Sequence, residues 1–561
     1  MTWFICIITQ KPFLEWEIEK FLQVHPQTTK TIIKSSFYFS YDCRQEIQYS
    51  EKPTEENPNF RLVMGKGYIS KTTGYAQADE ADFEKLINFE FAPADIDGFY
   101  LAFKIRENFM QLTNDMYAHY PVYYINADDY IIVSNKQHFI TQLIGKKHWN
   151  YSSISAFALL NLPLDRKAFI KNIATLPAGS VLTIRKNQID VVTNNSNFLS
   201  DNDVDEQKYL FTLKKAYEMQ INEKDFVNLP FEANFSSRFA FSVWCHKPKK
   251  LWGLYHLQTN EITPEKYIDI SYLNMLNIKK IQDFTDSDEL FELYKNYVLT
   301  TGLSDFPLLF PLSNFNCIDS NQINRPILSP MRQIKMNEIN FLGEYSEWFF
   351  ENQPLNRVEK IFKILRLNSF KDFKKNFVLE NYFFRDEFYP FLLKGLKQHF
   401  DDFVQNMTLT DTIYDKYHFL INNYHINICA KNFAWLNDYK NFYCPGLLYS
   451  LTCKHLQQRY LNSSIIDKSQ NFHMTLAEES LTFPKTKDTK YKDNIFNNTN
   501  NLFFHLMLEH ISMMLEKAEK VPYYDFEKLL KMYKKALKGN ENAVNIMIKW
   551  IAFEIWREFL E

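Results

Sequence analysis

Cysteine and histidine, the side chains that most often hold metals or act as nucleophiles, lack the spacing that such chemistry needs. The seven cysteines contain no C-x-x-C pair, so neither a zinc ribbon nor a disulfide framework is predicted. No H-x-x-x-H or H-E-x-x-H spacing occurs among the histidines, which include His25, His119, His138, His246, His256, His425 and His455. The sequence therefore predicts no metal site, and the scattered cysteines favour a reducing, cytoplasmic location.

Glycine, which phosphate-binding loops need, is scarce. It accounts for 12 of 561 residues, whereas roughly 7% is typical. Loops that cradle phosphates bring backbone N–H groups close to the ligand and usually contain several glycines. The closest glycines are Gly65, Gly67 and Gly74, and no segment matches a Walker loop or a complete G-x-G-x-x-G.

Composition and charge narrow the class of protein further. The chain has 46% apolar residues and a formal net charge of −3, which excludes a disordered protein. The densest basic cluster, 485–492, is interpreted as a solvated loop, so we expect no nucleic-acid partner. No apolar run approaches a membrane span, and the run at 3–8 is too short for a signal peptide, so no membrane partner is predicted either.

The elements that would position a site fall into two halves. Short β-branched and aromatic runs predict strands, followed by helices at 135–144 and 152–162 with Ser152 or Ser153 as N-cap, and further strands within 179–192. The predicted early strands are 3–9, 31–40, 60–64, 99–105, 110–114, 122–126 and 130–134. This half is therefore a mostly β domain, and 193–205 is predicted to be a polar linker.

After this linker, strand and helix patterns alternate. We expect a helix at 205–222, strands at 229–235, 250–257 and 278–284, and helices at 237–246, 264–276 and 287–302. Such alternation predicts a parallel sheet covered by helices. Beyond 357 the pattern is almost wholly helical, with an Asn-rich loop at 494–501.

Five segments, in this order, resemble asparagine synthetase and its relatives, which include the cyclases that close lasso peptides. D97-G-F-Y-L-A-F103 resembles "D-G-x-F-A-F", N114-D-M-Y-A-H-Y-P-V-Y-Y124 resembles "R-D-x-x-G-x-x-P-L-Y-Y", and Y130-I-I-V-S-N-K-Q-H-F139 resembles "F-A-S-E-x-K-x-L". F169-I-K-N-I-A-T-L-P-A-G-S-V-L-T183 is similar to "I-x-x-L-P-P-G", and the segment 423–448 is similar to the helical "R-x-S-M-A-x-x-x-E-x-R-x-P-F-L-D" region. Together they span roughly 1–490.

The resemblance implies a fold of α+β and α/β parts. Residues 1–200 would form a glutaminase-like β-sandwich of the Ntn-hydrolase type without the N-terminal cysteine. Residues 205–490 would form a parallel-sheet domain like the ATP-pyrophosphatase half of the family, and 491–561 a helical extension. ATP and Mg²⁺ are the cofactors that the resemblance implies if the chain is active; none is certain.

In the family, the glutaminase half uses a cysteine at position 2 as its nucleophile, and here position 2 is Thr2. A terminal threonine can in principle attack an amide with its own α-amine as base. The alternative is that Thr2 only begins a strand, because Trp3 replaces the family's glycine and 65–68 matches the "N-G-E-I-Y-N" substrate loop only loosely.

The synthetase signature "S-G-G-x-D-S", which holds pyrophosphate in the family, aligns with A233-N-F-S-S-R-F-A-F-S242. In this alignment Ser236 and Ser237 replace the glycines and Phe239 lies near the aspartate position, so two Cβ atoms narrow the loop and a Mg²⁺ ligand is lost. Arg238 either attracts an anion or is solvated.

A second signature, "S-G-E-G-A-D-E", is expected after a strand at 326–328. Ser329 matches its serine and Glu338 its last glutamate, so Glu338 is either a remnant of a catalytic pair or a charge on a helix surface. The family's late lysine corresponds to Lys485, Lys487 or Lys490.

Three functions remain. The chain is a pseudoenzyme that holds a peptide or protein partner in ribosomal-peptide modification, or a divergent ATP-dependent ligase or cyclase acting on a peptide or amino acid carboxylate, or a true glutamine-hydrolysing asparagine synthetase. The degenerate motifs favour the first and disfavour the third, because fold similarity does not carry function across such losses.

Overall fold

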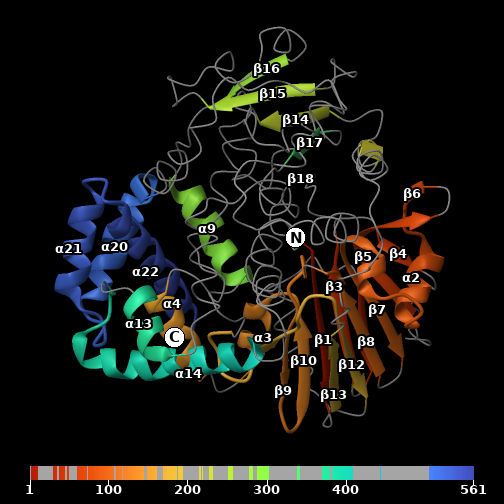
Figure 1. The fold of residues 1–561 in the computed structure, drawn as a ribbon, viewed down its shortest axis with the longest axis horizontal. Coiled ribbons are helices and arrows are strands. Elements are labelled where there is room, and N and C mark those ends of the chain that lie inside the picture. The colour runs from red at the N-terminus through yellow and green to blue at the C-terminus, as the bar shows by residue number, and fades with distance from the viewer. Residues whose placement is uncertain are drawn as a thin grey trace.

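The computed structural model describes residues 2–9, 30–34, 37–43, 47–49, 60–71, 74–106, 109–116, 118–144, 148–160, 168–185, 188–193, 214–215, 218, 226–230, 251–256, 277–281, 287–301, 338–341, 369–378, 382–407, 442–443 and 504–560. Two antiparallel sheets, one parallel sheet and a group of helices make up this part of the chain (Figure 1). The fold is thus of mixed α and β type.

The two antiparallel sheets form a sandwich from the first part of the chain. The first sheet contains β1 (Trp3–Thr9), β2 (Lys30–Lys34), β3 (Phe37–Asp42), β9 (Tyr123–Asn126), β10 (Tyr130–Ser134) and β11 (Ala174–Thr175), in the order β11-β9-β10-β1-β3-β2. The second contains β4 (Ile47–Tyr49), β5 (Phe60–Lys71), β6 (Gly74–Gln77), β7 (Asp97–Arg106), β8 (Phe109–Asn114), β12 (Ser180–Arg185) and β13 (Gln188–Thr193). The predicted β-sandwich is confirmed.

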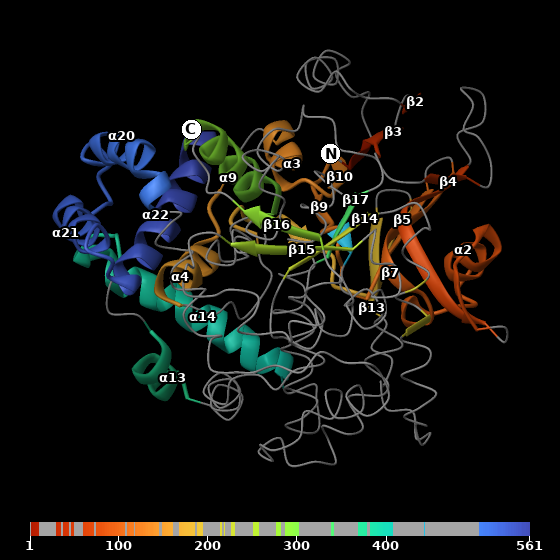
Figure 2. The same ribbon diagram turned by 90° about the horizontal axis from the view of Figure 1, so that it is seen from above.

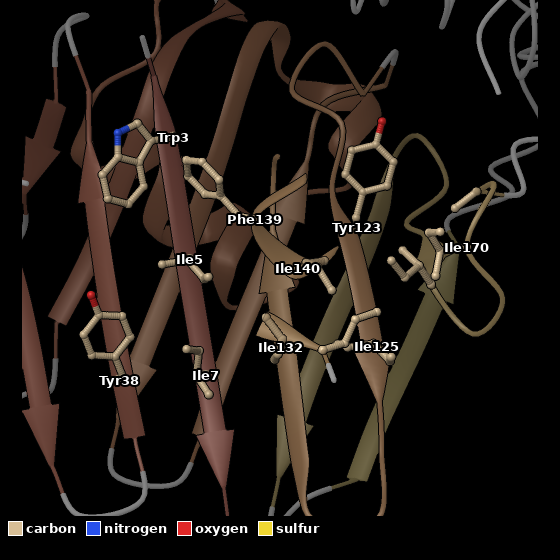
Figure 3. Packing of buried hydrophobic residues seen from close by; sticks show 13 residues of the cluster. Trp3, Ile5, Ile7, Tyr38, Tyr123, Ile125, Ile132, Phe139, Ile140 and Ile170 are labelled. Carbon is tan, nitrogen blue, oxygen red and sulfur yellow. The ribbon is translucent and has the colours of Figure 1, made fainter. Parts of the chain in front are cut away.

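Strand alternation builds a four-layer arrangement. Along β1, Phe4 faces the second sheet and meets Phe103 of β7 with ring centroids 4.9 Å apart. The opposite face of β1, with Trp3, Ile5 and Ile7, packs under helix α3 (Gln137–Leu143) (Figure 3). Helix α2 (Glu80–Ile87) covers the outer face of the second sheet in the same way. The layers are therefore helix, sheet, sheet and helix.

Several sequence expectations in this half need correction. The single strand expected at 31–40 is two antiparallel strands, β2 and β3. Residues 65–68, compared with a substrate loop, lie within β5. Helix α4 (Tyr151–Leu159) is capped by Asn150, whose side chain accepts from the Ser153 N–H, rather than by a serine. A capping residue precedes the first helical residue, and Asn150 holds that place.

The third sheet is parallel throughout its described strands. It contains β14 (Phe226–Pro230), β15 (Leu251–His256), β16 (Asn277–Ile281), β17 (Glu338–Phe341) and β18 (Phe442–Tyr443). Its order is β16-β15-β14-β17-β18. Strands β15 and β16 therefore lie on one side of β14, and the later strands β17 and β18 lie on the other side. The topological switch point lies between β14 and β17.

The remaining helices lie together beside the sandwich (Figures 1 and 2). They are α9 (Ser287–Thr301), α13 (Phe370–Phe377), α14 (Tyr389–Met407), α20 (Leu508–Ala518), α21 (Phe526–Ala536) and α22 (Glu541–Leu560), with short 3₁₀ turns η1 (Pro93–Asp95) and η4 (Asp386–Phe388) elsewhere in the chain. Helix α4 packs against α14, where Gly395 lies so close to Ser155 that a Cβ would approach its Oγ to 2.4 Å. A helix of the first predicted domain thus packs against a helix of the second.

Helix α22 joins distant parts of the chain. Lys549 donates to the carbonyl of Leu160 at the end of α4, and Trp556 Nε1 donates to the carbonyl of Val298 in the last turn of α9 at 3.3 Å. His138 of α3 bonds the neighbouring Leu299 carbonyl at 3.0 Å. These side chains satisfy carbonyl groups that a helix end leaves without an intrahelical partner.

Substitution of Gly98 tests the close approach of strands β5 and β7 in the second sheet. The φ of Gly98 is +124°, and a Cβ there would lie 2.2 Å from the Lys66 carbonyl oxygen of the paired strand. We expect Gly98→Ala to lower the free energy of unfolding by about 3 kcal/mol, from backbone strain and overpacking together.

Gly539 is the matched control for Gly98 in a urea titration. It also has a positive φ, +77°, but no atom lies within 4 Å of its virtual Cβ. Gly539→Ala should therefore cost only the strain, about 1 kcal/mol. Equal losses from the two variants would contradict the close approach at Gly98.

Candidate functional site at the amino end of the first strand

Thr2 lies at the amino end of β1 and is fully buried. Its hydroxyl faces the layer between the sheets, where Oγ1 is 3.9 Å from Cys43 Sγ, at the end of the neighbouring strand β3. Its carbonyl accepts a hydrogen bond from Asn135 Nδ2 at 3.1 Å. Both the side chain and the backbone of Thr2 are therefore engaged within the protein.

The segment that follows β10 fixes this end of β1. Asn135 Oδ1 accepts the Phe4 N–H at 2.9 Å, while Ser134 Oγ donates to the Phe4 carbonyl at 2.6 Å. Asn135 thus bridges two backbone positions of β1 with its one amide group. Gln137, fully buried at the start of α3, has no hydrogen-bond partner for its side chain in the part of the chain described here. A buried amide without a hydrogen-bond partner is costly unless water or a ligand satisfies it.

Asp115 and His119 form a buried pair that sequence reasoning did not select as a site. His119 Nδ1 and Asp115 Oδ1 are 2.7 Å apart, and both side chains are at most 1% exposed. Asp115 also accepts the His119 N–H at 3.2 Å, and its carbonyl accepts the Gly179 N–H at 2.9 Å. A carboxylate bound to Nδ1 fixes the orientation of an imidazole, as it does in catalytic triads. The i, i+4 spacing of Asp and His was the available signal.

Asn114 lies where the resembling motif has arginine, and both ends of its amide group bond the backbone. Its Oδ1 accepts the Ser180 N–H at 2.7 Å and its Nδ2 donates to the Pro177 carbonyl at 2.8 Å. The segments 114–124 and 169–183 are therefore in contact, which explains why both carry recognisable patterns. A guanidinium could pair with a ligand carboxylate, but this amide holds backbone instead.

Asp97 and Gly98, the start of another matched segment, also have structural roles. Asp97 accepts a hydrogen bond from Tyr75 at 3.0 Å in the buried part of the second sheet. Gly98 permits the close approach to Lys66 described above. Backbone packing thus accounts for this motif without a ligand.

Most of the predicted nucleotide-site residues lie outside the described residues. These are Ser236, Ser237, Arg238 and Ser329, together with the lysines at 485, 487 and 490. Their roles stay predictions. So do the elements expected at 237–246, 264–276, 326–328 and 494–501.

Glu338 is the first residue of β17, paired with Phe226 at the amino end of β14. The expectation of a helix surface is therefore wrong. Ligands of open parallel sheets bind beyond the carboxyl ends of the strands, near the switch point. Glu338 lies at the other edge of the sheet, and its catalytic role is not supported by this position.

The observed ends of β14 and β17 change the alignment of both synthetase signatures. β14 ends at Pro230, earlier than the expected 235, so the residues that follow it are F231-E-A-N-F-S-S237. Aligned from there, "S-G-G-x-D-S" places Glu232 and Ala233 at the glycines and Phe235 at the aspartate.

The same argument applies after β17, which ends at Phe341. The sequence L342-G-E-Y-S-E347 follows it, and Gly343 and Glu344 match the Gly-Glu pair of "S-G-E-G-A-D-E". The comparison with the resembling family had used a strand expected at 326–328, which lies outside the described residues, as do Gly343 and Glu344. The Gly-Glu dipeptide was the signal that could have revealed this second match.

No group of three or more metal-ligating side chains occurs among the described residues. Burial raises the pKa of the Cys6 thiol, which lies on the same face of β1 as Thr2, so this cysteine is unsuited to nucleophilic chemistry. None of the described helices is both long enough and apolar enough to cross a bilayer.

Comparisons with known proteins give little more. No protein-family model and no curated protein matches the chain. Among solved structures, the chain is similar to an allosteric regulatory enzyme of purine biosynthesis, with 10% identity over 43% of this chain and 56% of that one, at a TM-score of 0.20. It is also similar to glutamine phosphoribosylpyrophosphate amidotransferase from B. subtilis, with 11% identity over 54% of this chain and 72% of that one, at a TM-score of 0.19. Scores this low carry no argument, and nothing below rests on them.

Proposed function

We propose that this chain is an asparagine-synthetase-like pseudoenzyme that binds a peptide or protein partner, in the setting of ribosomal-peptide modification. The order of its parts supports this proposal. A four-layer sandwich comes first and a parallel sheet with an internal switch point follows it, which is the order that the resembling family has. In this proposal both halves keep the family's scaffold, and each has lost groups on which its chemistry depends.

The end of β14 at Pro230 is the observation that carries the proposal. It aligns Glu232 and Ala233 with two glycines that must let backbone N–H groups approach pyrophosphate. A carboxylate about 5 Å from a phosphate charge costs about 3 kcal/mol at an effective dielectric constant of 20. Phe235 supplies no oxygen for Mg²⁺ at the aspartate position. In this alignment the composition of the segment therefore opposes a triphosphate.

The surroundings of Thr2 support the loss of glutaminase activity. A nucleophile must reach the substrate carbonyl, and a base must lie within hydrogen-bond reach of it. The Thr2 side chain is buried and directed at the Cys43 sulfur, and Asn135 holds its carbonyl. Next to it, Trp3 is packed edge-on against Phe139 under α3, with ring centroids 5.4 Å apart. The Trp3 side chain therefore occupies a space that a glycine at this position would leave unfilled.

A second candidate function is a divergent ATP-dependent ligase or cyclase acting on a peptide or amino acid carboxylate. It is favoured by Gly343 and Glu344, which follow β17 on the carboxyl side of the switch point. A true glutamine-hydrolysing asparagine synthetase would need both degenerate sites to work and is the weakest candidate.

Exchange of labelled pyrophosphate into ATP distinguishes these functions. The purified chain is incubated with Mg²⁺, ATP and candidate carboxylates or peptides, and we expect no exchange above background. Exchange that disappears in Glu344→Gln but persists in Glu338→Gln would establish the ligase instead.

Glutamine hydrolysis tests the first half of the chain separately. We expect no glutamate release from the wild-type chain and no difference in Thr2→Ala. Release that Thr2→Ala abolishes would contradict the loss of the glutaminase. The same variant should retain its far-UV circular dichroism, so that misfolding is not mistaken for loss of a nucleophile.

A further inference from the structure

The outer face of α21 and its terminal turn carries four lysines, called here the lysine stripe: Lys531, Lys534, Lys535 and Lys538. Their spacing of i, i+3, i+4 and i+7 places them on one side, and all four are exposed. The opposite side of α21, with Leu529, Met532 and Ala536, is buried. Figures 1 and 2 both show α21 at the outer edge of the helical layer, away from the sandwich.

One acidic residue, Glu527, lies at i−4 from Lys531 on the same helix, so the lysine stripe keeps an excess of positive charge. Within the described part of the chain none of the four lysines takes part in an ion pair, whereas Lys528 on the same helix pairs with Asp386 and Asp525. Like charges three and four residues apart disfavour a helix, so these four side chains repel one another until an anion approaches.

Helix capping does not explain the lysine stripe. The end of α21 is already closed by backbone groups, because the Gly539 N–H bonds the Ala536 carbonyl at 2.8 Å and the Asn540 N–H bonds the Lys535 carbonyl at 3.2 Å. Gly539, with its positive φ, makes this turn. The lysine side chains are thus left for solvent or for a partner.

We propose that the lysine stripe docks an acidic segment of a partner polypeptide. It extends over about 10 Å along the helix axis, a length that acidic side chains at matching helical positions, or on alternate residues of an extended chain, can follow. The proposal deepens and rests on the partner-binding function proposed above, for which it names the surface and the chemistry of the partner.

Two other polyanions fit this surface less well. A membrane-binding helix presents its apolar side to lipid, but the apolar side of α21 is buried within the protein. Nucleic-acid grooves combine cations with exposed, stacking aromatic rings. The two aromatic residues of α21, Phe526 and Tyr533, are both half-buried, and the Tyr533 hydroxyl lies 3.1 Å from that of Ser512. The cations here are lysines, which lack the planar fork with which arginine grips phosphate.

The test measures binding of a short fluorescein-labelled oligoglutamate to the full chain by fluorescence anisotropy at low salt. Four exposed ion pairs predict about tenfold weaker binding when the four lysines of the stripe are changed together to glutamine. The matched control changes Lys371, Lys375, Lys394 and Lys397, exposed on α13 and α14, to glutamine. This control should bind as the wild-type chain does.

Any other binding result overturns the proposal. Absence of binding, or equal losses in the stripe and control variants, would remove the docking surface. Tighter, stripe-dependent binding of oligothymidine or of phosphatidylserine vesicles would assign the surface to nucleic acid or membrane. Pyrophosphate exchange by a chain that still binds the peptide would contradict only the loss of catalysis, so failures of the two proposals are distinguishable.

Discussion

Replacing Lys549 with methionine is expected to stabilise the chain near pH 7, with an advantage that disappears as the pH rises. Lys549 is buried within α22, and desolvation lowers its pKa from 10.5 to about 7. Its ammonium group donates to the Leu160 carbonyl and lies 5.9 Å from the centroid of the Phe157 ring. Removing an ammonium group from water carries a desolvation cost, which is the cause of the lowered pKa.

The sign of the pH dependence follows from proton binding. Between about 7 and 10.5 the unfolded chain binds more protons at this lysine than the folded chain, so the free energy of unfolding rises with pH. The rise amounts to about 1.4 kcal/mol per pH unit, or roughly 3 kcal/mol between pH 7 and 9.5. The Lys549→Met variant lacks this contribution but leaves the Leu160 carbonyl without its donor, which costs about 1 to 3 kcal/mol.

Urea titrations of both chains at several pH values measure this difference. The stability advantage of the variant should shrink by about 3 kcal/mol from pH 7 to 9.5. Lys517→Met is the control, because Lys517 is exposed on α20 and pairs with Glu558. Parallel curves for the wild-type chain and Lys549→Met would show that the lysine is not desolvated.

Loss of Arg557 is expected to destabilise the chain by about 3 to 5 kcal/mol. Arg557 Nε donates to Glu554 Oε2 at 2.9 Å, and Tyr524 donates to the same carboxylate at 2.6 Å. Glu554 is fully buried, so Arg557→Met would leave a charge in the core with one hydrogen bond to compensate it. Desolvation raises the pKa of Tyr524 well above its usual range, and this phenol therefore stays a hydrogen-bond donor.

The double variant Glu554→Leu with Arg557→Met distinguishes two effects on the free energy of unfolding. One is the loss caused by leaving Glu554 unpaired, and the other is the net contribution of the intact ion pair. Replacing both charges with apolar groups removes the desolvation cost together with the attraction. We expect the double variant to recover most of the stability that Arg557→Met loses. Thermal and urea unfolding measure both variants. If Arg557→Met lowered the free energy of unfolding by less than about 1 kcal/mol, Glu554 and Arg557 would behave as a solvent-exposed ion pair.

Local patterns predicted most of the sandwich because its strands alternate and are short. β1 and β10 were predicted with the bounds that the structure has, 3–9 and 130–134. The break between β2 and β3 was missed because Ser35 and Ser36 interrupt one continuous β-branched and aromatic run without glycine or proline. Helix α9, expected at 287–302, was found at 287–301.

Long-range features could not be predicted in this way. Asn135 contacts β1 across more than 130 positions of sequence, and Lys549 meets α4 across 389. The α22 contacts that join the first and last predicted domains depend on such pairings. At β14 the error was one of boundary: the predicted strand ran past Pro230, the proline at which the observed strand ends, and this shift moved the residues compared with the nucleotide signature. The alignment of a motif that follows a strand therefore depends on the residue at which that strand ends.

Thermal unfolding with and without saturating Mg²⁺ and ATP tests most directly whether the chain binds a nucleotide. A ligand at a hundred times its Kd would stabilise the folded chain by about 2.7 kcal/mol. We predict that the midpoint does not move, because the proposed alignment places Glu232 and Phe235 where the resembling family has groups that bind phosphate and Mg²⁺. A clear upward shift that follows the ATP concentration would contradict this prediction.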